Sequence, residues 1–159
     1  MEGVIVLLAA LAIDLAAPAR YESWSVDGRH VAVSDPASYS TSVYRVDGAT
    51  RTLRWSMSGW HRALHLANDG DHVAIPADDL GFVRADYDPS VEVLRVVRCG
   101  RTVRTVTLRD VVEDPRDLIR VSSFYWWGTF RGLEQDGASV RVETASRDFV
   151  FDLTTGMQR

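Results

Sequence analysis

From Tyr21 onward, apolar and polar residues alternate over short segments that are rich in Val, Thr, Tyr, Phe and Trp. Such a period of two is typical of strands with one face on a core and the other toward solvent. The pattern predicts an all-β domain of about 10 to 11 antiparallel strands in meander order. We expect these strands at residues 21–25, 29–34, 42–47, 51–57, 62–67, 72–76, 91–98, 101–108, 121–131, 138–145 and 148–153.

Two-residue sequences that tolerate a positive φ mark many of the turns between these segments. They are Asp27-Gly28, Asp47-Gly48, Asp69-Gly70, Cys99-Gly100 and Asp136-Gly137. Residues 109–119 break the alternation, and Pro115 limits any helix there. We expect a short helical turn or a loop at this place.

An internal repeat runs through the chain, and each copy is a turn that leads into a strand. The copies are residues 25–33, 67–75 and, more loosely, 134–142. Their aspartates are separated by 42 and then by 67 residues. The first spacing matches a four-stranded propeller blade, and the second matches a blade with an insertion that contains residues 109–119.

The motif Ser-x-Asp-Gly-Arg-x-x-Ala-Val, followed by an aromatic strand that ends in Asp-Gly or Thr-Thr-Gly, resembles the blades of WD-repeat proteins and of the periplasmic Tol-system propellers. The resemblance covers residues 21–98 and, more loosely, residues 134–157. The stretch from Trp60 to Ile75 and the Thr-Thr-Gly ending also resemble small exported bacterial proteins of unassigned function.

The resemblance implies propeller-like sheets, but three blades are fewer than a closed propeller needs. We therefore expect an open partial propeller or a sandwich. The alternative is a half propeller that a second copy completes, because two copies would close the ring and cover the exposed sheet edges. The chain is thus a possible homodimer.

The first 19 residues differ in character from the rest of the chain. Residues 4–13 form an unbroken apolar run, and Ala17-Pro18-Ala19 has the small-x-small form of a signal-peptidase site. This pattern predicts a signal peptide that is cleaved after Ala19, a periplasmic or secreted protein, and no membrane span in the mature chain. Glu2 stands where a signal peptide usually carries a basic residue. The alternatives are that the true start lies upstream of Met1 or that the run forms the first buried strand or helix of the domain.

Length and charge narrow the function classes further. The chain has 159 residues, which suits one domain, and we assign residues 20–159 to a single all-β domain. The net charge of -4 has the wrong sign for a phosphate-binding surface, so we expect no nucleic-acid partner. All 18 basic residues are arginine. Cys99 is the single cysteine and cannot form an intramolecular disulfide.

The densest aromatic cluster, residues 124–130, is the first candidate binding surface. In a regular strand, Tyr125 and Trp127 share one face, while Phe124, Trp126 and, past Gly128, Phe130 share the other. The alternative is a bulge at Gly128 that re-aims the residues after it. We expect Trp126 and Trp127 to differ sharply in burial, and the exposed rings to form a patch with an arginine rim. The predicted partner-binding residues are Tyr125, Trp126, Trp127, Arg120 and Arg131. The alternative is that all of these rings pack in the core.

Two further groups resemble metal ligands without completing a site. The first group, on the loop between Pro76 and Pro89, consists of Asp78, Asp79, Asp86 and Asp88, but it lacks the ligand spacing of a calcium loop. The second group consists of His61, His65 and His72, and it lacks a zinc-binding spacing. We therefore expect no metal and no cofactor.

No nucleophile elbow and no glycine-rich phosphate loop occur in the sequence. We therefore predict a non-catalytic binding or interaction module of the bacterial cell envelope, whose partner is a protein or a glycan. The alternative is a small secreted hydrolase or lyase that acts on glycan or peptide through Asp78, Asp86 or Asp88. A long loop in an all-β domain is where such function tends to reside.

Overall fold

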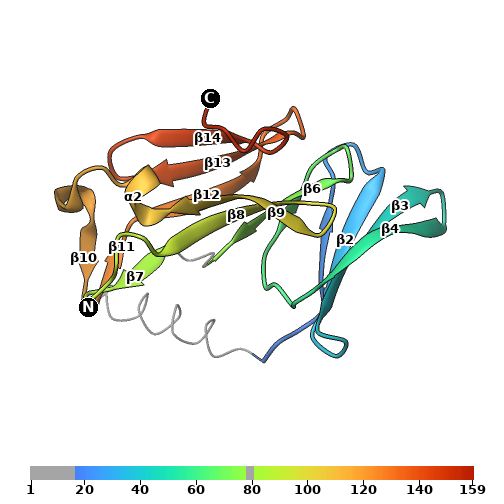
Figure 1. Ribbon diagram of the computed structural model, residues 1–159, viewed down its shortest axis with the longest axis horizontal. Coiled ribbons are helices and arrows are strands. Elements are labelled where there is room, and N and C mark those ends of the chain that lie inside the picture. The colour runs from blue at the N-terminus through green and yellow to red at the C-terminus, as the bar shows by residue number, and fades with distance from the viewer. Residues whose placement is uncertain (1–16, 78–80) are drawn as a thin grey trace, which may run out of the picture.

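The computed structural model describes residues 17–77 and 81–159. Within these residues the chain forms four antiparallel sheets and no closed barrel, which confirms the predicted all-β class (Figure 1). Three of the sheets are meanders of consecutive or nearly consecutive strands, as in propeller blades. The fourth is a small sheet at the side of the molecule. No helix in the described part of the chain has the length and hydrophobicity that crossing a membrane requires.

The first sheet has the order β1-β2-β3-β4 and the second the order β5-β6-β8-β9. The strands of the first sheet are β1 (Tyr21–Trp24), β2 (His30–Asp35), β3 (Ser40–Asp47) and β4 (Thr50–Ser58). Those of the second sheet are β5 (His65–Leu66), β6 (His72–Pro76), β8 (Glu92–Arg98) and β9 (Arg101–Thr107).

The third sheet has the order β12-β13-β14 and the small sheet the order β10-β11-β7. The third sheet contains β12 (Gly128–Leu133), β13 (Ser139–Thr144) and β14 (Asp148–Asp152). The small sheet contains β10 (Ile119–Val121), β11 (Phe124–Trp126) and β7 (Phe82–Arg84). Helix α2 (Leu108–Val111) and a 3-10 helix (Pro115–Asp117) lie in the predicted break in the strand pattern.

The second sheet lies between two hydrophobic cores because its strands alternate between two buried faces. One face, with Val73 and Val97, packs against the first sheet. The other face, with Ala74 and Val96, packs toward the third sheet. This double burial explains why β6 is apolar at nearly every position, in contrast to the alternating strand β3 of the first sheet.

The internal repeat is a structural repeat as well. In each copy, the backbone N–H two residues before the aspartate bonds the carbonyl three residues after it: Ser25 to His30, Ala67 to His72, and Glu134 to Ser139, at 3.0, 2.9 and 2.8 Å. The aspartate side chain accepts a hydrogen bond from the backbone two residues later, an Asx turn.

The three repeat turns also touch one another in a row. The backbone N–H of Asp27 bonds the side-chain oxygen of Asn68 at 3.1 Å, and the backbone N–H of Asn68 bonds the carbonyl of Gly137 at 2.7 Å. This row, which we call the turn row, joins the first, second and third sheets at one end of the molecule.

The predicted single strand at residues 121–131 is wrong, because the chain changes sheets there. Ser122 adopts a left-handed φ of 57° in the tight turn that connects β10 to β11. After Trp126 the chain passes from the small sheet to the third sheet, and the Trp127 N–H bonds the Gly81 carbonyl at 2.9 Å. Strand β7, which pairs with β11, was not predicted from the sequence.

The change of sheets also overturns one face assignment. Phe130 was expected on the side of Trp126, but it packs against the larger core and contacts the Trp127 ring edge-on, with a centroid distance of 5.7 Å. Strict alternation holds only within one regular strand. Here the chain leaves one sheet and enters another between the two residues, and a bulge follows between Phe130 and Gly132.

Candidate functional site

The predicted aromatic cluster divides between core and surface. Trp127 is 2% exposed and belongs to the larger core, and Tyr125 packs against that core while staying partly exposed. Trp126 is partly exposed on the opposite face of β11, in register with Ile119 and Phe82. The two tryptophans thus differ in burial, and Trp126 is the one that a partner could reach.

The two predicted rim arginines lie on different sheets. Arg120 is on β10, where its side chain is 3.5 Å from the carbonyl of Ser122. Arg131 is on β12, at the bulge, and forms an ion pair with Glu143 at 2.6 Å.

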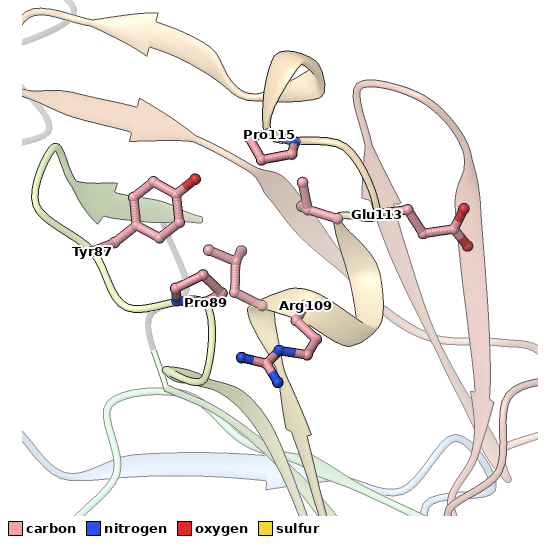
Figure 2. Close-up of a pocket in the computed structure, with 7 residues that line it drawn as sticks. Tyr87, Pro89, Arg109, Glu113 and Pro115 are labelled. Carbon is pink, nitrogen blue, oxygen red and sulfur yellow. The ribbon is translucent and has the colours of Figure 1, made fainter.

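A pocket opens beside these aromatic residues, where the C-terminal part of the long loop, between β7 and β8, meets the segment after β9 (Figure 2). We call it the loop pocket; its volume is about 340 Å³. Its lining residues are Tyr87, Pro89, Leu108, Arg109, Val112, Glu113 and Pro115. The Tyr87 ring also contacts the Tyr125 ring edge-on at 6.1 Å, so the pocket adjoins the predicted aromatic strand.

Local hydrogen bonds hold the segment after β9 in place. Asp110 accepts hydrogen bonds from the backbone and the hydroxyl of Thr107, at 2.7 and 2.9 Å, and so caps the start of α2. The Arg109 N–H bonds the carbonyl of Pro89 at 3.0 Å, which ties α2 to the long loop. Both sides of the loop pocket are thus held by backbone contacts rather than by side-chain packing alone.

The pocket has an apolar interior and a charged rim. Leu108 is buried in the larger core and Val112 packs against it, while Tyr87, Pro89 and Pro115 surround the opening. The Glu113 carboxylate points away from the pocket and pairs with Arg147 at 2.5 Å (Figure 2). Such a pocket suits an apolar side chain more than a polar ligand.

Arg109 supplies the rim charge. Its guanidinium forms no ion pair within residues 17–77 and 81–159. Its positive charge contributes to lowering the pKa of Asp88, which lies below its usual value chiefly because the Ser90 backbone and hydroxyl donate hydrogen bonds to that carboxylate. Arg109 is therefore available to an acidic group of a partner.

The aspartates of the long loop are not among the residues that line the pocket. Asp86 pairs with Arg84 at 3.2 Å, and Asp88 accepts hydrogen bonds from Ser90 at 2.8 and 2.7 Å. Asp78 and Asp79 lie outside the described residues. Within the described ranges, no three His, Cys, Asp or Glu side chains gather in a metal-binding geometry.

The three histidines considered as zinc ligands have separate environments. His72 is buried and lies 2.6 Å from Asp69 of its own repeat turn. Burial lowers the pKa of His65. The pKa of His61 is lowered as well, first by burial and then by the charge of Arg95.

The residues that line the loop pocket were not predicted from the sequence. Tyr87, Arg109 and Val112 carried no motif, because a pocket made by two loops has no spacing that a single chain segment displays. No protein-family model matches this chain, and no curated protein is significantly similar to it in sequence. What the protein does is therefore inferred from its own residues.

Proposed function

We propose that this protein is a non-catalytic interaction module that binds a protein partner by taking an apolar side chain into the loop pocket. The observation that supports this most is the pocket itself: an apolar hollow of about 340 Å³ whose rim carries Arg109, which forms no ion pair with the residues that the structure describes. An anchor residue in a small desolvated pocket typically contributes most of the energy of such an interface. Arg109 would select a partner with an acidic residue beside the anchor.

We propose the bacterial cell envelope as its location, periplasmic or secreted. The apolar run of residues 4–13 and the sequence Ala17-Pro18-Ala19 support this. Expression of the full chain in a Gram-negative host, followed by fractionation and N-terminal sequencing, tests it. A new N-terminus at Arg20 in the periplasmic fraction is expected, and an intact chain in the cytosol would contradict the location.

The binding proposal is tested with a phage-displayed library of random short peptides selected on the purified protein. We expect enriched peptides to share an apolar residue next to Asp or Glu. Val112→Arg, which places a charge in the pocket, should weaken their binding at least about tenfold. Val103→Arg is the matched control, because Val103 is 50% exposed on β9 and does not line the pocket.

A second pair of variants tests the charge at the rim. Arg109→Glu should weaken peptide binding in a salt-dependent way, whereas Arg101→Glu, an exposed arginine on β9, should not. Enrichment of no peptide, or equal binding by Val112→Arg, would refute the loop pocket. Loss of binding in Trp126→Ala alone would place the interface on the other face of β11 instead.

The alternative function is a carboxylate-dependent hydrolase or lyase. Its candidate carboxylates already have local partners, because Asp86 forms an ion pair with Arg84 and Asp88 accepts a hydrogen bond from the Ser90 hydroxyl. Turnover of a glycan or peptide panel by the wild-type protein, abolished by Asp86→Asn or Asp88→Asn, would favour it over the interaction module.

A further inference from the structure

A second hollow, independent of the loop pocket, lies between the first and second sheets. We call it the inter-sheet groove; its volume is about 480 Å³. Its floor is the outer edge of the smaller core, at Ile75 and Val97. The side chains that surround this floor include Tyr39, Ser58, Trp60, His61, Arg95 and Thr102. A volume of this size is in the range of small-molecule sites.

Two aromatic side chains line the groove and are reachable from solvent. Tyr39, in the turn between β2 and β3, is 66% exposed, and Trp60 is partly exposed. The indole N–H of Trp60 donates a hydrogen bond to the carbonyl of Ala19 at 2.8 Å in the full chain, and the proposed cleavage after Ala19 removes this acceptor. Exposed aromatic ring faces at an open groove form stacking surfaces for a ligand.

Tyr39 adopts a backbone conformation that its side chain disfavours. Its φ is 48°, in the left-handed region, where a bulky residue is uncommon and glycine or asparagine is preferred. The Tyr39 carbonyl accepts a hydrogen bond from the Gly59 N–H at 2.8 Å, which holds the turn against the groove. A strained, exposed ring that contributes little to the core points to a role at the surface.

The polar groups of the groove supply both donors and acceptors and little net charge. Arg95 is paired with Glu92 at 2.9 Å, so its charge is largely compensated. His61 lies over Gly59, where an added Cβ would stand 3.3 Å from its ring nitrogen, and burial favours the neutral imidazole. The hydroxyls of Ser58 and Thr102 complete a lining that suits a neutral ligand rich in hydroxyl groups.

We propose that the inter-sheet groove is a saccharide-binding site, in which Tyr39 and Trp60 stack on sugar rings and His61, Arg95, Ser58 and Thr102 hydrogen-bond their hydroxyls. The C–H faces of a sugar ring are weakly positive and match the negative face of an aromatic ring. The compensated charge of the groove favours a neutral oligosaccharide over an anionic one.

The test measures binding of three neutral oligosaccharides, cellotetraose, maltotetraose and chitotetraose, by isothermal titration calorimetry and by tryptophan fluorescence. We expect saturable binding of at least one of them. Tyr39→Gly and Tyr39→Asn remove the ring and suit the left-handed backbone, so both should fold while binding at least about tenfold more weakly.

Two control variants show whether weaker binding comes from loss of the Tyr39 ring itself, rather than from a change in backbone strain or the loss of any exposed aromatic ring. Ser122→Gly relieves a similar φ of 57° far along the chain, in the turn between β10 and β11, and should leave binding unchanged. Trp24→Ala removes another exposed ring, 45% exposed on the first sheet but absent from the groove lining, and should also leave it unchanged.

Three results would overturn the proposal. They are no saturable binding of any of the three probes up to the millimolar range, undiminished binding by both Tyr39 variants, and an equal loss of binding in the Trp24→Ala control. Val112→Arg, which blocks the loop pocket, should leave saccharide binding intact. The proposals for the loop pocket and for the inter-sheet groove can therefore be confirmed or refuted independently.

Discussion

Trp126 and Trp127 are neighbours in the chain with different environments. Trp127 is 2% exposed among the residues of the larger core, while Trp126 lies on the opposite face of a three-residue strand. At this scale a one-residue step decides whether an indole stabilises the fold or remains available to a partner.

We expect Trp127→Ala to lower the free energy of unfolding by about 3 to 5 kcal/mol, because it leaves a cavity in the larger core. Trp126→Ala should cost less than half as much and should reduce association with any partner that uses this face. Urea unfolding of both variants measures the difference. Equal losses in the two variants would contradict the burial difference.

At the scale of elements, the turn row connects three sheets through contacts between turns. Gly28 and Gly70 occupy the same position in successive copies and have the same φ of 70°. A Cβ added at Gly28 would meet nothing within 4 Å, whereas one at Gly70 would lie 2.4 Å from the buried ring of His30. Substitution of Gly28 therefore measures only the cost of a left-handed backbone, whereas substitution of Gly70 adds the cost of disturbing the contact between turns.

Gly28→Ala should therefore cost about 1 kcal/mol of stability, the price of a left-handed alanine. Gly70→Ala should cost about 1 to 3 kcal/mol more, because the His30 ring must move within a packed site. Thermal or urea unfolding of the two variants checks this. Equal destabilisation would mean that the turn row does not pack as described.

The third turn of the row contains an aspartate, Asp136, whose pKa is strongly lowered. Hydrogen bonds to Asp136, first from the Ala138 backbone and then from Ser139 and Arg159, lower its pKa from 3.8 to about 2. A carboxyl whose pKa is lowered on folding stabilises the folded state above its unfolded pKa. That contribution is lost as the pH falls from about 4 through about 2.

Asp136→Asn keeps an acceptor for the turn but removes the charge. We expect the variant to melt at a lower temperature than the wild type at neutral pH, and we expect this gap to narrow as the pH falls toward about 2. Melting temperatures measured across this range test it. A gap that stays constant with pH would show that the charge of Asp136 contributes nothing.

At the scale of the whole molecule, the stack of three sheets ends in two outer faces. On the first sheet, Arg51 lies 5.3 Å from the Trp24 ring centroid and pairs with Glu22 at 3.0 Å, above the fully buried Val31. These long side chains cover the apolar surface beneath them.

The outer face of the third sheet is more highly charged. Arg131 pairs with Glu143 at 2.6 Å, and Arg141 pairs with Glu134 and Asp148 at 2.6 and 3.0 Å. A ring completed by a second copy would bury these ion pairs against the Trp24 face of the partner, and the desolvation penalty opposes this.

We therefore expect a monomer in dilute solution, measured by light scattering coupled to size-exclusion chromatography. The predicted completion of the ring by a second copy would instead give twice the monomer mass. If the wild type had twice the monomer mass and Trp24→Glu returned it to the monomer mass, the first sheet would be the dimer interface. The ion pairs of the third sheet would then not prevent dimerisation.

The sequence by itself determined the strands, most turns and the repeat, because each depends on neighbours within a few residues. Alternation predicted β2, β3, β8, β9, β13 and β14 to within a few residues, and each Asp-Gly pair predicted its turn. The glycines at positions 28, 70 and 137 adopt the positive φ that this pattern requires.

Tertiary structure decided the division of residues 119–133 into three strands, the pairing of β7 with β11, and both hollows. Each depends on contacts between segments far apart in the chain, such as Trp127 with Gly81 or Tyr87 with Tyr125. Local patterns carry no information about which distant backbone supplies a hydrogen bond. The loop pocket and the inter-sheet groove exist only where the packed sheets and their loops meet.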